Sequence, residues 1–316
     1  MPEPQLRDGK PLVVCIVGPT ATGKSELGVR LAEQLGGEIV SADSMQVYRG
    51  MDVGTAKLTP AEMRGIPHHL IDVVDPDESF SVGRWASLAR VAITGITGRG
   101  KIPFIVGGTG LYIRAVTAGL DFAQEEGSLK LRSDWQEFVA AYGSVALHQE
   151  LARRDPVTAA RLHPNDLRRV IRALEVEELT GKPMSAEYNW NSDKSPYTVL
   201  QFGLTGERQW LYGRVNQRVD AMMKCGLLEE VTRLLEKGYH PQNTALQAIG
   251  YKELVSYLRG ETTEAQAIAD VKQATRRLVK RQLSWFRRDP RTVWFDVSRD
   301  SLDAVGSQIL YEIKSM

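Results

Sequence analysis

The chain has 316 residues, of which 42% are hydrophobic and 25% charged, and its net charge is +1 at pH 7. This composition is typical of a globular protein with a substantial core in one or two domains, so any nucleic-acid-binding surface must be local. The two cysteines, Cys15 and Cys225, lie in no C-x-x-C pattern, which argues against a zinc site or a disulfide framework. The N-terminus lacks an apolar signal segment, and no apolar stretch reaches membrane-spanning length. We therefore expect a cytoplasmic protein that does not enter a membrane.

A phosphate-binding loop follows the first predicted strand. The apolar run 13–17 leads into GPTATGKS, which has the spacing G-x-x-x-x-G-K-[ST]. Its glycines let backbone N–H groups turn toward one phosphate cluster, Lys24 adds a cation, and the Ser25 hydroxyl suits Mg²⁺. A glycine-rich turn that binds nothing explains the complete spacing less well. The residues predicted to bind a diphosphate or triphosphate are Gly18, Pro19, Thr20, Ala21, Thr22, Gly23, Lys24 and Ser25.

Strands and helices alternate over the first part of the chain. In chain order they are strand 13–17, helix 24–35, strand 38–42, strand 70–74, helix 81–97 and strand 102–106. This alternation predicts an α/β fold, a parallel sheet flanked by helices on both faces. Ligands of such sheets bind at the carboxyl ends of the strands, so the loops after the strands should meet in one crevice. Those loops begin at Gly18, Asp43, Asp75 and Gly107.

The composition changes between residues 121 and 196, where glycine is sparse and Glu, Arg, Ala and Leu dominate. Asn165 or Asp166 can cap a helix whose apolar residues follow helical spacing until Gly181. We expect an all-helical insertion domain over 121–196 and a catalytic core formed by 1–120 and 197–316. The elements expected after the insertion are strand 197–204, helices 207–237, 245–258 and 264–288, and strand 292–297.

Three features near the predicted crevice could carry chemistry. Asp43 follows the second strand and could hold Mg²⁺ through water or remove a proton, although a solvated strand-end aspartate in a turn is an equal alternative. The GGTG segment that begins at Gly107 allows close approach of a ligand, or it simply ends a strand. Arg214 and Arg218 lie four residues apart on one helix face. They could neutralise leaving-group charge, or they could be solvated arginines.

Two basic clusters are local exceptions to the near-neutral charge. Arg168, Arg169 and Arg172 share a side of the inserted helix. A second cluster combines seven cations with two aromatic residues near the end of the chain: Arg276, Arg277, Lys280, Arg281, Trp285, Phe286, Arg287, Arg288 and Arg291. Such density favours contact with a nucleic-acid backbone over a merely solvated helix face. The five histidines form no metal-ligand spacing and are interpreted as structural.

Seven motifs in order resemble the bacterial tRNA dimethylallyltransferase family. They are GPTATGKS (18–25), SADSMQVYRGMDVGTAK (41–57), PHHLIDVVDP (67–76), IVGGTGLYIRA (105–115), HPNDLRRVIRALEV (163–176), QAIGYKEL (247–254) and KRQLSWFR (280–287). The resemblance runs from about residue 12 to residue 296 and is weakest over 121–135. It implies a P-loop NTPase-like core and prenyl transfer to N6 of adenine 37, beside the tRNA anticodon.

The resemblance also implies roles for individual residues. The loop would hold the diphosphate of dimethylallyl diphosphate with Mg²⁺ at Ser25, while Lys24 and Arg214 neutralise charge. Asp43 matches the general base, and Thr20, Thr22 and Thr109 match the reaction channel. Adenine must leave the stacked anticodon stem-loop to reach this crevice. The positions that match tRNA contacts of the family are Asp43, Ser44, Met45, Gln46, Thr109, Arg132, Arg168, Arg169, Val170, Ile171, Arg172, Gln247, Ala248, Ile249, Gly250, Tyr251, Lys252, Lys280, Arg281, Gln282, Trp285 and Arg287.

Three other classes remain alternatives. A small-molecule kinase would bind ATP in the same loop but leaves both basic clusters without a function. A prenyltransferase of free adenine nucleotides would need no RNA contact. A nucleotide-dependent switch has no sequence support, because the chain contains no N-K-x-D guanine-reading segment. We expect a monomer, because one chain can bind one RNA stem.

Overall fold

The computed structural model describes residues 6–7, 9–119, 128–187 and 195–315. The chain divides into two compact units, Met1–Thr117 with Ser195–Met316, and Ala118–Lys194. The first boundary expected from the sequence, between residues 120 and 121, lies outside the described residues. The second unit therefore interrupts the first in the chain, between the strands β5 and β6 defined below.

The first unit is built on a sheet of parallel strands in the order β4-β3-β5-β2-β6-β7. A short strand, β1, pairs antiparallel with the beginning of β2. The strand bounds are β1 Leu6–Arg7, β2 Lys10–Val17, β3 Glu38–Ser41, β4 His68–His69, β5 Pro103–Gly107, β6 Thr198–Thr205 and β7 Thr292–Asp296. Strand β2, which precedes the phosphate loop, is thus central, between β5 and β6. The expected parallel α/β fold is confirmed.

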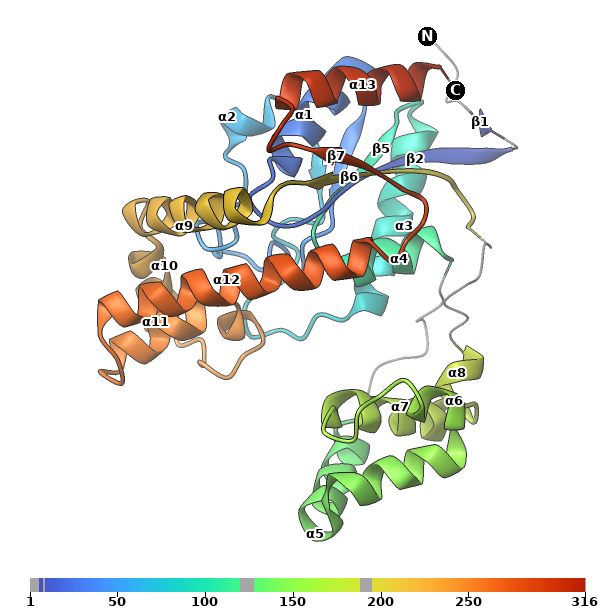
Figure 1. Ribbon diagram of the computed structural model, residues 1–316, viewed down its shortest axis with the longest axis vertical. Helices are drawn as coiled ribbons and strands as arrows, with labels where there is room; N and C mark the ends of the chain where they lie inside the picture. The colour runs from blue at the N-terminus through green and yellow to red at the C-terminus, as the bar shows by residue number, and fades with distance from the viewer. Residues whose placement is uncertain (1–5, 8, 120–127, 188–194, 316) are drawn as a thin grey trace. The chain divides into compact units, whose positions relative to one another are not determined.

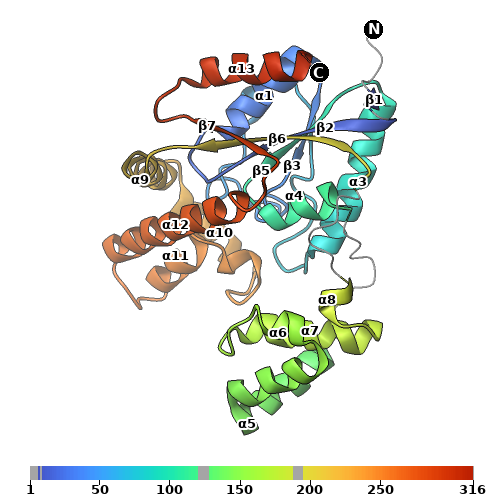
Figure 2. The same cartoon turned by 45° about the vertical axis from the view of Figure 1, so that its right-hand side comes forward.

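Helices cover both faces of this sheet. Figures 1 and 2 show α1 and α13 on one side and α4 and α12 on the other. The helices of the first unit are α1 Lys24–Leu35, α2 Pro60–Met63, α3 Val82–Gly98, α4 Gly110–Thr117, α9 Arg208–Lys224, α10 Leu227–Glu236, the 3₁₀ turn η1 Ala245–Gln247, α11 Tyr251–Leu258, α12 Glu264–Phe286 and α13 Leu302–Lys314.

The core forms because β2 is apolar on both faces. Val14 and Ile16 pack with Leu27 of α1 and Val305 of α13, and all four are fully buried. Toward the other face, Trp85 of α3 stacks on Tyr112 of α4 at 4.5 Å between ring centroids. Each such large apolar side chain contributes about 1.5–3 kcal/mol on burial. The central strand is therefore held from both sides, which fixes the start of the loop that follows it.

The second unit is helical and has its own core. Its helices are α5 Leu129–Arg154, with a break in helical geometry at Gly143, α6 Pro156–Ala159, α7 Leu167–Thr180 and α8 Met184–Glu187. Leu147 and Leu151 of α5 pack with Val170 and Leu174 of α7. The helix expected until Gly181 is confirmed as α7, which ends there in a left-handed turn. Among the described residues, no helix combines the length and the apolar character that a membrane crossing requires.

The prediction of a strand at 70–74 is wrong. Strand β4 is His68–His69, and Val74 makes only an isolated bridge with Tyr48. Leu70 and Asp72 have φ angles of 64° and 56°, and this left-handed conformation cannot continue an extended strand. The apolar run 70–74 is therefore a folded segment whose backbone bonds to Gln46 and Val47, and Asp75 does not follow a sheet strand.

Two helices expected after β6 are each divided in the structure. The stretch 207–237 breaks into α9 and α10 at Gly226, whose φ of 92° permits the turn. The stretch 245–258 divides into η1 and α11 at Gly250, with a φ of 97°. Helices α4 and α13 were not expected, although Val305, Ile309 and Ile313 of α13 have helical spacing after the Ser301 cap.

A buried ion cluster at the beginning of β3 yields a stability prediction. The Glu38 carboxylate, 3% exposed, accepts from Arg99 Nη2 at 2.6 Å, His69 Nε2 at 2.7 Å and Lys101 Nζ at 3.0 Å. Burial alone raises the pKa of Glu38, but the hydrogen bonds from its three basic partners lower it to about 2. The stabilisation is present above the unfolded-state pKa near 4.5 and is lost as pH falls toward 2.

We predict that Glu38→Gln lowers the free energy of unfolding by about 3 kcal/mol at neutral pH. Urea denaturation of both proteins should show this difference shrinking as pH falls below about 4. A difference that stays constant with pH would contradict the assignment of the stabilisation to the charged carboxylate.

Candidate active site

Three loops meet at one edge of the sheet because the strands before them are parallel neighbours. Strand β5 pairs with β2 on one side and with β3 on the other, with Val17 opposite Gly107 and Ser41 opposite Val106. The segments that begin at Gly18, Asp43 and Gly108 therefore leave the sheet side by side. This is the edge where ligands of open α/β sheets bind.

The phosphate loop has the backbone conformation that its glycines predict. Gly18 has a φ of 133°, and the Leu204 carbonyl leaves no room for a Cβ at this position. Gly23 has a φ of 87° and begins α1 without a side-chain cap, so the first N–H groups of this helix face the loop. Inside the loop, the Pro19 carbonyl accepts from Thr22 Oγ1 at 2.9 Å and from Lys24 Nζ at 2.6 Å. The loop is an ordered turn that offers N–H groups to an anion.

The charge on Lys24 is destabilised by its surroundings. Burial and the charge of Arg218 lower the pKa of Lys24 to about 7, against the opposing attraction of Asp43. The side chain is 9% exposed. An anion in the loop would relieve this repulsion and return the pKa toward its ordinary value.

We predict that a diphosphate bound in the loop draws about one proton onto Lys24 at pH 8 and fewer at pH 6, since the free amine is mostly neutral above its pKa. Calorimetry in buffers of different ionisation enthalpy measures this uptake. Lys24→Arg is the control, because a guanidinium remains charged over this range. Equal proton uptake by both proteins would contradict the role of Lys24.

Asp43 and Thr109 are brought together as expected. The Asp43 Oδ1 accepts from the Met45 N–H at 2.9 Å, a turn that fixes the carboxylate. Thr109 Oγ1 accepts from the Ser44 N–H at 3.0 Å, while its own N–H donates to the Ala42 carbonyl. These bonds join the loop after β3 to the loop after β5.

Helix α9 brings two arginines to the phosphate loop. Arg214 Nε lies 3.4 Å from the Ala21 carbonyl, and its guanidinium lies 5.5 Å from the Trp210 ring centroid. Arg218 is more buried than Arg214. Burial lowers the pKa of Arg218, and the nearby charge of Arg214 lowers it further, against the attraction of Asp43. The sequence left open whether Arg218 neutralises charge or is solvated, and in the structure its charge acts on both Lys24 and Asp43.

Two tRNA-contact candidates on α12 face the loops instead of solvent. The Gln282 Oε1 accepts from the Thr20 N–H at 2.9 Å, and its Nε2 donates to the Gly108 carbonyl at 3.1 Å. The Trp285 indole covers Gly110 so closely that a Cβ there has no room. In the sequence, Gln282 is a polar residue within the apolar stripe of α12, and this signal could have indicated its inward position.

A buried carboxylate holds the segment after Asp43. Glu230 of α10, 1% exposed, accepts from the backbone N–H groups of Asp52 and Val53 at 2.8 Å and of Gly54 at 3.1 Å. The Tyr251 hydroxyl donates to the same carboxylate at 2.6 Å. Tyr251 is fully buried, so its side chain contacts protein groups, not solvent. Sequence reasoning missed Glu230, which also interrupts an apolar stripe.

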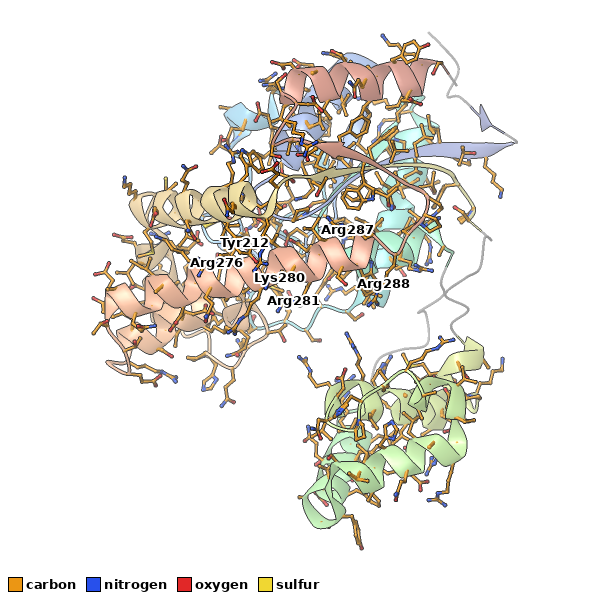
Figure 3. All side chains as sticks on the ribbon, viewed as in Figure 1. Tyr212, Arg276, Lys280, Arg281, Arg287 and Arg288 are labelled. Atoms are coloured by element: carbon orange, nitrogen blue, oxygen red, sulfur yellow. The ribbon has the colours of Figure 1, made fainter. Side chains whose placement is uncertain are left out.

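The basic cluster of α12 forms an exposed surface. Figure 3 shows Arg276, Lys280 and Arg281 on this helix and Arg287 and Arg288 directly after its end, with Tyr212 of the neighbouring α9 beside them. Arg276 donates to Asn216 at 2.8 Å, whereas Lys280, Arg281, Arg287 and Arg288 are exposed. We call these four exposed residues the α12 cationic surface. In η1 and α11, Gln247 and Lys252 are exposed, Ala248 and Ile249 are half-buried, and Gly250 is buried.

The residues of the helical unit that the sequence predicted to contact tRNA differ in exposure. Arg168 and Arg169 are exposed, whereas Val170 and Ile171 belong to the core of the unit. Arg132 Nε lies 2.9 Å and Arg172 Nη1 2.6 Å from the carboxylate of Glu175, which is fully buried. The two paired arginines keep one carboxylate neutralised inside the unit.

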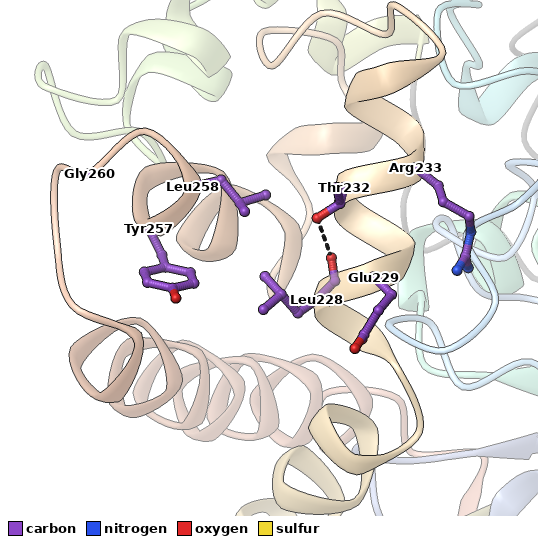
Figure 4. A pocket seen from close by; sticks show the side chains of 7 residues that line it. All are labelled: Leu228, Glu229, Thr232, Arg233, Tyr257, Leu258 and Gly260. Carbon is purple, nitrogen blue, oxygen red and sulfur yellow. Dashed lines mark hydrogen bonds between the residues drawn. The ribbon is translucent and has the colours of Figure 1, made fainter.

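A separate groove of about 530 Å³ lies between α10 and α11 (Figure 4). Its lining residues are Leu228, Glu229, Thr232, Arg233, Tyr257, Leu258 and Gly260. The Thr232 hydroxyl donates to the Leu228 carbonyl at 2.9 Å, an ordinary contact within the helix. None of the phosphate-loop residues lines this groove.

The described residues contain no group of three or more His, Cys, Asp or Glu side chains arranged as metal ligands. The Ser25 hydroxyl follows Lys24 in the loop, and this arrangement fits a Mg²⁺ ion that arrives with phosphate oxygens and keeps several waters. Asp43 follows β3, the strand on the other side of β5, and is an acidic group at the same edge.

Comparisons with known proteins identify the family. The family model described as IPP transferase matches residues 46–289, and one described as isopentenyl transferase matches residues 11–74. This chain belongs to the IPP transferase family. It is 55% identical over 288 residues to a tRNA dimethylallyltransferase of Desulforudis audaxviator, covering 91% of this chain and 92% of that protein. A relative from Carboxydothermus hydrogenoformans with the same name is 50% identical over 303 residues, 95% of this chain and 96% of that protein.

Solved structures of the family share the fold. The full-length tRNA isopentenylpyrophosphate transferase of Bacillus halodurans has a TM-score of 0.73 and 47% identity, over 96% of this chain and 95% of that one. A eukaryotic dimethylallyltransferase described as acting on tRNA has a TM-score of 0.82 and 31% identity, over 96% of this chain and 78% of that one. The resemblance inferred from the seven motifs is therefore confirmed.

Proposed function

We propose that this protein transfers a dimethylallyl group from dimethylallyl diphosphate to N6 of adenine 37 in the tRNA anticodon loop and releases diphosphate. The observation that carries the proposal is the placement of a phosphate loop and a strand-end carboxylate, Asp43, at one sheet edge, in a member of this family. A kinase explains the loop equally well but gives no function to the α12 cationic surface.

The phosphate loop acts on the leaving group. As the bond between the dimethylallyl carbon and the diphosphate oxygen breaks, both bonding electrons go to the diphosphate, and negative charge grows there. Lys24 and the N–H groups of the loop lie where they can stabilise this charge, and Arg214 and Arg218 add two further cations. Preorganised donors of this kind supply a large part of the rate acceleration in group transfer.

Asp43 acts on the nucleophile. The lone pair of N6 is delocalised into the adenine ring, so this nitrogen is a poor nucleophile. As N6 forms its bond to the allylic carbon it must lose a proton, and we assign that proton to the Asp43 carboxylate. The Met45 N–H donates to one carboxylate oxygen of Asp43 and so orients the group. Thr109 Oγ1 accepts from the N–H of Ser44, the residue after Asp43, and therefore lies beside this loop.

Ser25 would hold Mg²⁺ together with diphosphate oxygens, and the ion would supply additional charge for the leaving group. Dimethylallyl diphosphate is thus the proposed donor in the loop, not ATP. We further propose that one chain acts alone, because the loop, the carboxylate and the basic surfaces all belong to the same chain; sedimentation equilibrium measures this.

The RNA is bound by positive surfaces on both units. The α12 cationic surface and the exposed Arg168 and Arg169 of α7 provide charge for the stem backbone. Adenine reaches the sheet edge by leaving the base stack, as base-modifying enzymes require. Ser44 lies next to Asp43, where it can contact neighbouring nucleotides. The Gln46 amide instead accepts from the Ser41 hydroxyl at 2.9 Å and donates to the Thr55 carbonyl at 3.2 Å.

Radiolabelled dimethylallyl diphosphate tests the proposal. With Mg²⁺ and unmodified tRNA, label should enter tRNA and not free AMP. Label in AMP alone would assign the protein to the free-nucleotide class. Turnover of ATP without transfer of label would contradict prenyl transfer and support a kinase.

We predict that Asp43→Ala lowers the turnover number by about 10²–10⁴, the usual contribution of a positioned general base, while tRNA affinity stays within a few-fold. Single-turnover prenylation and tRNA filter binding measure the two quantities separately. An equal loss in both would contradict the role of Asp43 as a base.

We predict that Lys280→Ala and Arg281→Ala each weaken tRNA binding and reduce the slope of log affinity against log salt by about 1, since each removes a phosphate contact. Filter binding from about 50 to 200 mM salt measures the slope. Arg299→Ala is the control, because Arg299 is equally cationic and 72% exposed but lies outside α12. Equal slopes in all three variants would contradict RNA binding by this surface.

A further inference from the structure

The Gln282 side chain joins the two loops that would align the reacting groups. Its Oε1 accepts the Thr20 N–H of the phosphate loop at 2.9 Å, and its Nε2 donates to the Gly108 carbonyl at 3.1 Å. An uncharged amide both accepts and donates through one planar group, which suits this pair of contacts. Both hydrogen-bonding atoms are therefore used within the protein.

Helix α12 holds this amide in place from either side. One turn before Gln282, Val279 is buried against Ala21 and Leu211. One turn after it, the Trp285 indole covers Gly110. Gly108 also has no room for a Cβ, because the Gln282 amide lies directly against it. The half-buried amide is therefore held between the loops.

Hydrogen bonds and short backbone segments together connect Gln282 with the loop that carries the carboxylate. Gly108 precedes Thr109, whose Oγ1 accepts the Ser44 N–H at 3.0 Å. Ser44 follows Asp43. The path thus runs from Thr20 of the phosphate loop through Gln282 and Thr109 to the residue beside the general base. It links the two loops beyond the sheet edge, in addition to the pairing of their strands.

We infer that Gln282 is a positioning residue that aligns the phosphate loop with the Asp43 loop, and that it does not contact RNA through its amide. The inference rests on the proposed function. It differs from the expectation that Gln282 binds tRNA, because the two roles change different kinetic quantities. A misaligned donor and acceptor slow the chemical step, whereas a lost RNA contact weakens tRNA binding.

Gln282→Met tests this difference, because methionine has a similar length and removes both hydrogen bonds. We expect the single-turnover rate at saturating substrates to fall about tenfold or more, since small misplacements of reacting groups are costly. The tRNA dissociation constant should change less than about twofold, since no phosphate contact is lost. Gln273→Met, at an exposed position of the same helix, is the matched control and should behave as wild type.

Gln282→Glu separates hydrogen bonding from packing. An ionised carboxylate accepts from Thr20 but repels the Gly108 carbonyl, whereas a protonated carboxyl donates to it as the amide does. The rate of this variant relative to wild type should therefore rise as pH falls through the carboxyl range. A role in packing alone would leave this ratio constant, because the two side chains have the same shape.

The outcomes are distinguishable from failure of the proposed function. If the wild-type protein does not prenylate tRNA, the proposed function fails. If it does, and Gln282→Met has a normal rate or loses only tRNA affinity, the positioning role is wrong. A pH-independent ratio for Gln282→Glu would also overturn it. Thermal unfolding of each variant checks that the comparison is between folded proteins.

Discussion

The parallel pairing of β3, β5 and β2 is the constraint on which the site depends. Neighbouring parallel strands end at the same edge, so the pairing of the strands by itself brings the phosphate loop, Asp43 and Thr109 to one place. Packing of α1 and α13 on one face and of α3 and α4 on the other holds β2 in place. The precise positions then come from short hydrogen bonds between the loops.

The site is charged before any substrate arrives. Arg218 lies close to Lys24, Asp43 and Arg214, and burial together with Arg218 lowers the pKa of Lys24 to about 7. A diphosphate relieves the repulsion between these cationic groups, and its charge is greatest after the allylic bond breaks. The arrangement therefore stabilises the departing diphosphate more than the intact donor, which is what transition-state stabilisation requires.

The sequence predicted the parts of the site that depend on local pattern. The apolar run before GPTATGKS fixed the strand, the loop and α1, and strand alternation placed Asp43 and Thr109 at the same edge. The sequence predicted a strand at 70–74 wrongly, because the left-handed conformation of Leu70 and Asp72 is not visible in the apolar pattern. The pattern also did not predict that Gln282 and Glu230 point inward, because a buried polar side chain finds its partners only in the tertiary structure. Both residues interrupt the apolar stripe of their helix, and such an interruption in the sequence can indicate a polar side chain that points inward.

The identity of the modified nucleoside tests the central claim most directly. tRNA can be purified from cells that lack their own prenyltransferase, with and without expression of this protein, and analysed by nuclease mapping and mass spectrometry. The account predicts N6-dimethylallyladenosine at position 37 only when the protein is present, and none when Asp43→Ala replaces it. Unmodified adenine at that position in cells expressing the folded wild-type protein would contradict the account.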